Sequence, residues 1–132
     1  MINSGPICWK SGRQSIVTLS STEAEWVALT LATKEAAAVT NLMKELAHCN
    51  IKPVEIYEDN QPAIDLTKRP LSDGRTKHMD VRWCYIHQEL SKGAIKVSWI
   101  STNEQAADGL TKALNPVKFQ RFKDLIRVRD VR

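Results

Sequence analysis

Apolar and polar residues along the chain follow two different periods, one typical of helices and one typical of strands. Apolar residues at intervals of three and four predict a long helix from Thr22 to about Cys49, and Pro53 marks a stop beyond it. The same spacing returns in HMDVRWCYIHQELSKG, where Gly93 closes a second helix. The segments GPICWK, VEIYE and AIKVSWI read as short strands.

Polar residues at the segment boundaries predict three shorter helices. QPAIDLTK follows Asn60, a plausible cap, and carries a proline in its first turn. Ser101 and Thr102 are expected to cap a helix over NEQAADGLTKAL, and Asn115 precedes a proline that opens a last basic helix. RPLSDGRTKH reads as a polar loop.

The order of these elements is strand, helix, strand, helices, strand, helices, which predicts an α/β domain. A length of 132 residues suits one domain with its own core, so residues 1–132 are predicted to form a single domain. No stretch approaches the roughly 18 apolar residues that a membrane span needs, and the N-terminus lacks the apolar stretch of a signal peptide. We therefore expect an intracellular protein, cytoplasmic or nuclear, with no membrane partner.

Cysteine usage and net charge refine this picture only slightly. Cys8, Cys49 and Cys84 are odd in number and far apart, which predicts reduced, partly buried thiols and indicates neither a disulfide framework nor a zinc site. Lys and Arg number 19 against 15 Asp and Glu, giving a net charge of +4. This excess permits a polyanionic partner, although a solubilising surface explains it equally well.

The stretch SSTEAEWVAL holds two glutamates that invite different interpretations. Ser20 with Glu23 fits the capping-box pattern, and Thr22 with Glu25 fits it too. Capping therefore explains one glutamate, and the other remains a candidate for a catalytic or metal-binding role.

Two aspartates fall at other element ends. Asp59 directly follows the strand VEIYE, at the carboxyl end where open α/β sheets place ligands, although turn and cap chemistry also accounts for it. Asp108 lies in the second turn of the helix after AIKVSWI, where an acid also favours the helix dipole. A compact α/β fold could bring Glu25, Asp59 and Asp108 to one rim, as a magnesium site of hard oxygen ligands requires.

Four motifs carry a resemblance to a known family. SSTEAEWVAL, IYEDNQPAI, RTKHMDVRWCYI and NEQAADGLTKAL, in this order and at these intervals, resemble the ribonuclease H domain of Ty/copia-type retrotransposon polyproteins. The resemblance runs from about Gly5 to Leu125. It implies a mixed sheet flanked by helices, and two magnesium ions that cleave the RNA strand of an RNA–DNA hybrid.

The resemblance also assigns residues. It implies that Glu25, Asp59 and Asp108 are the catalytic metal ligands for Mg²⁺ or Mn²⁺, which leaves Glu23 as the cap. Within RTKHMD and the turn after it, a basic cluster could meet the phosphates of the hybrid, although a solvated loop is an equal alternative. The residues of this cluster are Arg75, Lys77, His78 and Arg82.

The chain departs from the family pattern at its start. Members have two strands before the counterpart of GPICWK, and the first of these strands carries a further aspartate that bridges both metals. No acid precedes Glu23 here. We therefore expect a sheet of about three strands, impaired cleavage, and either a homodimer through an exposed strand edge or complementation by another chain. The alternatives are a degenerate, domesticated module that binds nucleic acid or a protein partner, and an inert fragment.

The remaining histidines and the tryptophans are given structural interpretations. His48 is expected at a helix end and His87 on a helix face. The four tryptophans could stack on bases, but their spacing favours core positions. They are Trp9, Trp26, Trp83 and Trp99.

Overall fold

The computed structural model describes residues 6, 8–14, 17–18, 20–47, 52–70 and 77–128, with the backbone alone at 47 and 77–80. These residues fall into two units that are described separately. The larger is Thr18–Trp99, and the smaller combines Met1–Val17 with Ile100–Arg132. The single domain over residues 1–132 stays a prediction.

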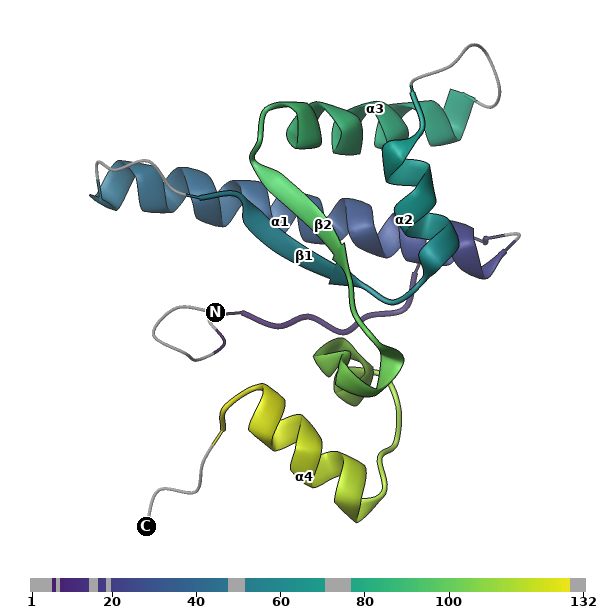
Figure 1. Ribbon diagram of the computed structural model, residues 1–132, viewed down its shortest axis with the longest axis vertical. Coiled ribbons are helices and arrows are strands. Elements are labelled where there is room, and N and C mark those ends of the chain that lie inside the picture. Colours follow the sequence, from purple (N-terminus) through teal and green to yellow (C-terminus); the bar gives the residue numbers. More distant parts are fainter. Residues whose placement is uncertain are drawn as a thin grey trace. The chain divides into compact units, whose positions relative to one another are not determined.

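The larger unit is a two-stranded parallel sheet with helices (Figure 1). The strands pair in register from Val54 opposite Ile95 to Glu58 opposite Trp99. The α/β class is thereby confirmed, with two strands rather than three among the described residues. The elements are α1 (Ser21–Ala47), β1 (Val54–Glu58), α2 (Gln61–Lys68), α3 (Lys77–Ser91) and β2 (Ile95–Trp99).

The third predicted strand, GPICWK, is not formed in the residues that the structure describes. Positions 6 and 8–10 lie outside any strand, and the Trp9 side chain is 73% exposed. A strand is stable only when its backbone groups pair with a neighbour. Within the described residues the one ladder is that between β1 and β2, so this segment has no partner there.

The helix boundaries follow from local capping, as predicted. The Ser20 hydroxyl accepts a hydrogen bond from the Glu23 backbone N–H at 3.1 Å, which supports Glu23 as the capping-box residue. The Asn60 side chain accepts one from the Ala63 N–H at 3.0 Å. Gly93 ends α3 with φ at 65°, a left-handed conformation that glycine adopts without penalty.

The core lies where α1 and α3 meet the sheet. Trp26, Leu29 and Ile86 are at most 2% exposed. The ring centroids of Trp26 and Trp83 are 5.3 Å apart, a tilted aromatic pair. These two tryptophans are core residues as predicted, whereas the prediction was wrong for Trp9 and for Trp99, which is 59% exposed. Partly buried residues complete the cluster: Ile56, Leu66, Trp83, Leu90 and Val97.

The two faces of the sheet differ in chemistry because successive side chains of a strand point to opposite sides. Ile56 and its register partner Val97 pack on the core. On the other face, Glu55 accepts hydrogen bonds from the Ser98 hydroxyl at 2.6 Å and from the Lys96 ammonium at 3.0 Å. These two hydrogen bonds, with a third from Tyr57, lower the pKa of Glu55 to about 2. This face therefore carries a polar network.

The smaller unit holds α4 (Pro116–Leu125) and two short 3-10 helices, η1 (Thr102–Glu104) and η2 (Ala106–Leu110). The α-helix predicted over NEQAADGLTKAL is wrong, because most of its backbone hydrogen bonds span three residues, as from the Asp108 N–H to the Gln105 carbonyl. Ser101 makes no side-chain cap, and Gly109 lowers helix propensity. Asn115 does cap α4, accepting from the Lys118 N–H at 2.9 Å.

Two further sequence predictions concern thiols and membranes. Cys8 and Cys84 are free as predicted, but exposed rather than partly buried. Cys49 lies outside the described residues. None of the described helices is long and apolar enough to cross a membrane.

Replacing Ile86 should test the core directly. We expect Ile86→Ala to lower the free energy of unfolding by about 2–5 kcal/mol, because its fully buried side chain would leave a cavity against Trp26 and Leu29. Urea unfolding followed by circular dichroism measures the change. Val81→Ala on the same helix is the control, since Val81 is 74% exposed, and an equal loss in both variants would contradict this core.

Candidate functional site

Two of the three predicted ligands lie in the larger unit. Asp59 follows the last residue of β1 and precedes α2, so it stands at the carboxyl end of the parallel sheet. Glu25 lies in α1, and both side chains are half-buried. Their charges both act on a third carboxyl group, that of Glu58. The structure therefore gathers Glu25 and Asp59 around one position at the strand end.

Glu58 is a buried acid that the sequence predictions missed. Its side chain is 5% exposed, and one carboxylate oxygen accepts a hydrogen bond from the Asn60 backbone N–H at 3.0 Å. Burial, together with the charges of Glu25 and Asp59, raises the pKa of Glu58 to about 7, although the hydrogen bond from Asn60 opposes the rise. A carboxyl group with this pKa exchanges its proton near neutral pH.

A signal for Glu58 exists in the sequence. Alternation along VEIYE places Val54, Ile56 and Glu58 on one side of the strand, and the apolar members of that set identify the buried side. An acid in register with the buried residues is unusual, because ionised carboxylates are costly to bury.

Three neighbouring carboxyl groups create mutual repulsion that a cation would relieve. Glu25, Glu58 and Asp59 supply only oxygen donors, the class that Mg²⁺ and Mn²⁺ prefer. Within the described ranges, however, no group of three or more His, Cys, Asp or Glu side chains is arranged to hold a metal ion. These oxygen donors thus suit a divalent cation, but the described residues do not form a complete coordination shell.

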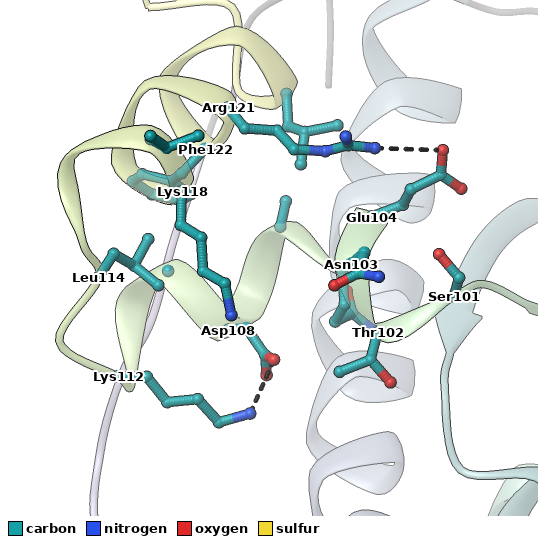
Figure 2. Close-up of a pocket in the computed structure, with 15 residues that line it drawn as sticks. Ser101, Thr102, Asn103, Glu104, Asp108, Lys112, Leu114, Lys118, Arg121 and Phe122 are labelled. Carbon is teal, nitrogen blue, oxygen red and sulfur yellow. Dashed lines mark hydrogen bonds and ion pairs between the residues drawn. The ribbon is translucent and has the colours of Figure 1, made fainter.

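Asp108 belongs to the smaller unit and has a partner of its own. Its carboxylate forms an ion pair with the Lys112 ammonium at 2.7 Å, one helical turn further on (Figure 2). A metal ion bound by Asp108 would compete with this ammonium group. Because the two units are described separately, the convergence of Asp108 with Glu25 and Asp59 stays a prediction.

The same acid lines a pocket of about 650 Å³ formed by η1, η2 and α4 (Figure 2). Its wall carries a second ion pair, between Arg121 and Glu104 at 3.6 Å. Figure 2 shows the Lys118 side chain extending into the same space. Apolar side chains, including Leu114 and Phe122, supply the rest of the lining. The pocket is therefore lined by apolar side chains and by charged groups of both signs.

One glycine sets how closely η2 approaches α4. A Cβ atom added at Gly109 would lie 2.6 Å from two atoms of the Phe122 ring, far inside normal contact. The hydrogen of glycine lets the ring pack directly on the backbone of η2. Gly109 thus positions the helix turn that carries Asp108.

The residues predicted to bind nucleic acid are only partly described. Arg75 lies outside the described residues, as does His48, and for Lys77 and His78 the backbone alone is given, at the start of α3. Arg82 is half-buried on α3. Their role stays a prediction. His87 lies on α3, as expected, and stacks on Trp83 with ring centroids 5.4 Å apart.

The comparisons with known proteins point to one group. The chain is 42% identical over 122 residues to the retrovirus-related Pol polyprotein from transposon TNT 1-94 of Nicotiana tabacum, covering 92% of this chain. It is 37% identical over 123 residues to those from transposons RE1 and RE2 of Arabidopsis thaliana, covering 93%. The chain spans only 8–9% of the length of these relatives. No family model and no solved structure matches it.

The raised pKa of Glu58 predicts a pH-dependent stability. The folded state holds the Glu58 proton up to about pH 7, whereas the unfolded chain releases it near 4.5, so this residue lowers stability as pH rises through that window. We expect Glu58→Gln, measured by urea unfolding without divalent cations, to raise stability at pH 8 by roughly 1–3 kcal/mol and to change it little at pH 4.

Glu55→Gln on the same strand is the control for this change. The pKa of Glu55 is lowered by its hydrogen bonds, so removing its charge should give no gain at pH 8. An equal gain in stability in both variants would contradict a destabilisation that is specific to the Glu58 carboxylate.

The close approach at Gly109 gives a second prediction. Gly109→Ala should displace the Phe122 ring and lower the thermal stability of the smaller unit by about 1–3 kcal/mol, as overpacking does. Gly12→Ala is the matched control, because a Cβ at Gly12 would meet nothing within 4 Å. Thermal melts, with NMR of the Phe122 ring, measure the effect, and an unmoved ring in Gly109→Ala would refute this contact.

Proposed function

From the similarity to retrotransposon Pol polyproteins, we propose that this chain is the ribonuclease H region of a copia-type polyprotein and cleaves the RNA strand of RNA–DNA hybrids. One structural observation carries the proposal: Asp59 directly follows a parallel strand, and Glu25 of α1 lies near enough that both act on Glu58. Carboxylates gathered at this end of a sheet suit phosphodiester hydrolysis.

Glu25, Asp59 and Asp108 are the proposed ligands of Mg²⁺ or Mn²⁺. When bound, such ions activate water and stabilise the departing oxygen of a phosphodiester. The chain itself contributes negative charge, already concentrated at Glu25 and Asp59, and a neighbouring proton carrier in Glu58. Asp108 joins this set only if Lys112 releases it, and phosphate oxygens of a substrate offer that ammonium a new partner.

Nucleic-acid affinity would come from basic residues outside the acidic cluster. The proposed phosphate contacts are Arg75, Lys77, His78 and Arg82, in and beside the segment RTKHMD. Contacts of this kind bind hybrids with little sequence preference and weaken as salt rises. A protein that retained them while losing cleavage would act as a binding module, the alternative function.

The proposal is tested by incubating the 132-residue chain with a labelled RNA–DNA hybrid and Mg²⁺ or Mn²⁺. We expect slow RNA-strand cleavage, because the described residues do not form a complete metal site. Asp59→Asn should lower it at least about 100-fold, since losing a residue that merely orients a metal ligand already costs up to that factor. Asp65→Asn is the control, because Asp65 is an exposed acid on the neighbouring α2.

Binding of the same hybrid, measured by fluorescence anisotropy, separates the outcomes. Hybrid binding without metal-dependent cleavage would replace the nuclease proposal with the binding module. Cleavage unchanged in Asp59→Asn would remove the proposed site.

A further inference from the structure

The long helix α1 exposes an apolar stripe on the side opposite its core face. Leu31, Leu42 and Leu46 are 46%, 54% and 70% exposed, and Ala28 and Ala38 are exposed beside them. Spacings of three and four residues align these side chains along one side of a helix. We call this surface, which begins at the half-buried Ala24, the leucine–alanine stripe.

The stripe is long and continuous enough to be an interface. From Ala24 to Leu46 a helix rises about 33 Å. The other side of α1 is occupied by the core residues Trp26 and Leu29, so the stripe is the surface of α1 left for a partner. Single exposed leucines need no explanation, but an aligned row of them marks a contact site.

We propose that the occupant of the leucine–alanine stripe is α1 of a second copy of this chain, packed antiparallel about a two-fold axis that passes at Glu35. A two-fold interface must be complementary to itself, because the same surface serves both subunits. The stripe meets this condition in both side-chain size and charge.

Size complementarity follows from the sequence of the stripe. An antiparallel two-fold at Glu35 places Ala28 opposite the partner's Leu42 and Leu31 beside the partner's Ala38. Ala24 then falls opposite the partner's Leu46. Each leucine meets an alanine, so large and small side chains alternate along the contact, as close helix packing requires.

Charge complementarity fixes the centre of the interface. Lys34 and Glu35 are both exposed and adjacent in sequence. The two-fold brings the Glu35 side chains of the two copies together, and Lys34 of each copy flanks the partner's Glu35. The two ammonium groups offset the repulsion between the two glutamates, and shifted registers are disfavoured because Glu35 would meet an apolar side chain.

The expected dimer is weak. One pair of helices in contact over this length buries an area near the low end for specific interfaces, about 1,200 Å² in total. Sedimentation velocity of the full chain from about 1 to 200 µM should therefore show a monomer–dimer equilibrium with a micromolar dissociation constant.

Three variants test the assigned surface. Leu42→Glu places a charge opposite Ala28 and should weaken the dimer at least tenfold. Glu35→Lys should also weaken it, by setting four positive charges at the axis, whereas the double change Lys34→Glu with Glu35→Lys should restore it. Val81→Glu on α3 is the control, since Val81 is exposed away from the stripe. Circular dichroism verifies that each variant is folded.

Two results would overturn the proposal. One is a parent chain that remains monomeric at 200 µM. The other is a dimer that persists in both Leu42→Glu and Glu35→Lys, which would assign association to another surface, such as the strand edge expected from the sequence. Failure of the charge-swapped double variant to recover would reject the assigned axis.

Discussion

The parallel pairing of β1 with β2 is the constraint on which the larger unit depends. Parallel strands cannot be joined by a tight turn, so the chain crosses over through α2 and α3 between them. These helices and α1 bury the face that carries Ile56 and Val97. The same pairing sets the carboxyl ends of both strands at one edge, where Glu58 and Asp59 stand.

The carboxyl end of the sheet concentrates negative charge, and this lowers the stability of the folded state. Glu58 is buried beside two other acids, and its raised pKa records the cost of ionising it there. The core next to it offsets such a cost with fully buried residues such as Trp26 and Ile86. Among its polar groups, the buried hydroxyl of Thr33 donates a hydrogen bond to the Leu29 carbonyl one turn back, at 2.8 Å. Charge repulsion concentrated at one edge of a stable core is typical of a functional site.

The smaller unit is built differently, from short-range contacts. Its turns are 3-10, its helix α4 leaves Val117 80% exposed, and the close contact of Gly109 with Phe122 joins η2 to α4. Asp108 is held in this unit by its ion pair with Lys112, so any ligand that binds its carboxylate must displace that ammonium group.

The sequence by itself determined what depends on neighbours along the chain. The caps at Ser20, Asn60 and Asn115, the helix end at Gly93 and the strand VEIYE were all predictable, because capping and periodicity act over a few residues. Tertiary structure alone decided whether GPICWK found a strand partner and whether Trp99 was covered. It also turned Glu58 from a strand residue into the buried centre of an acidic cluster, because burial and repulsion arise from residues distant in sequence.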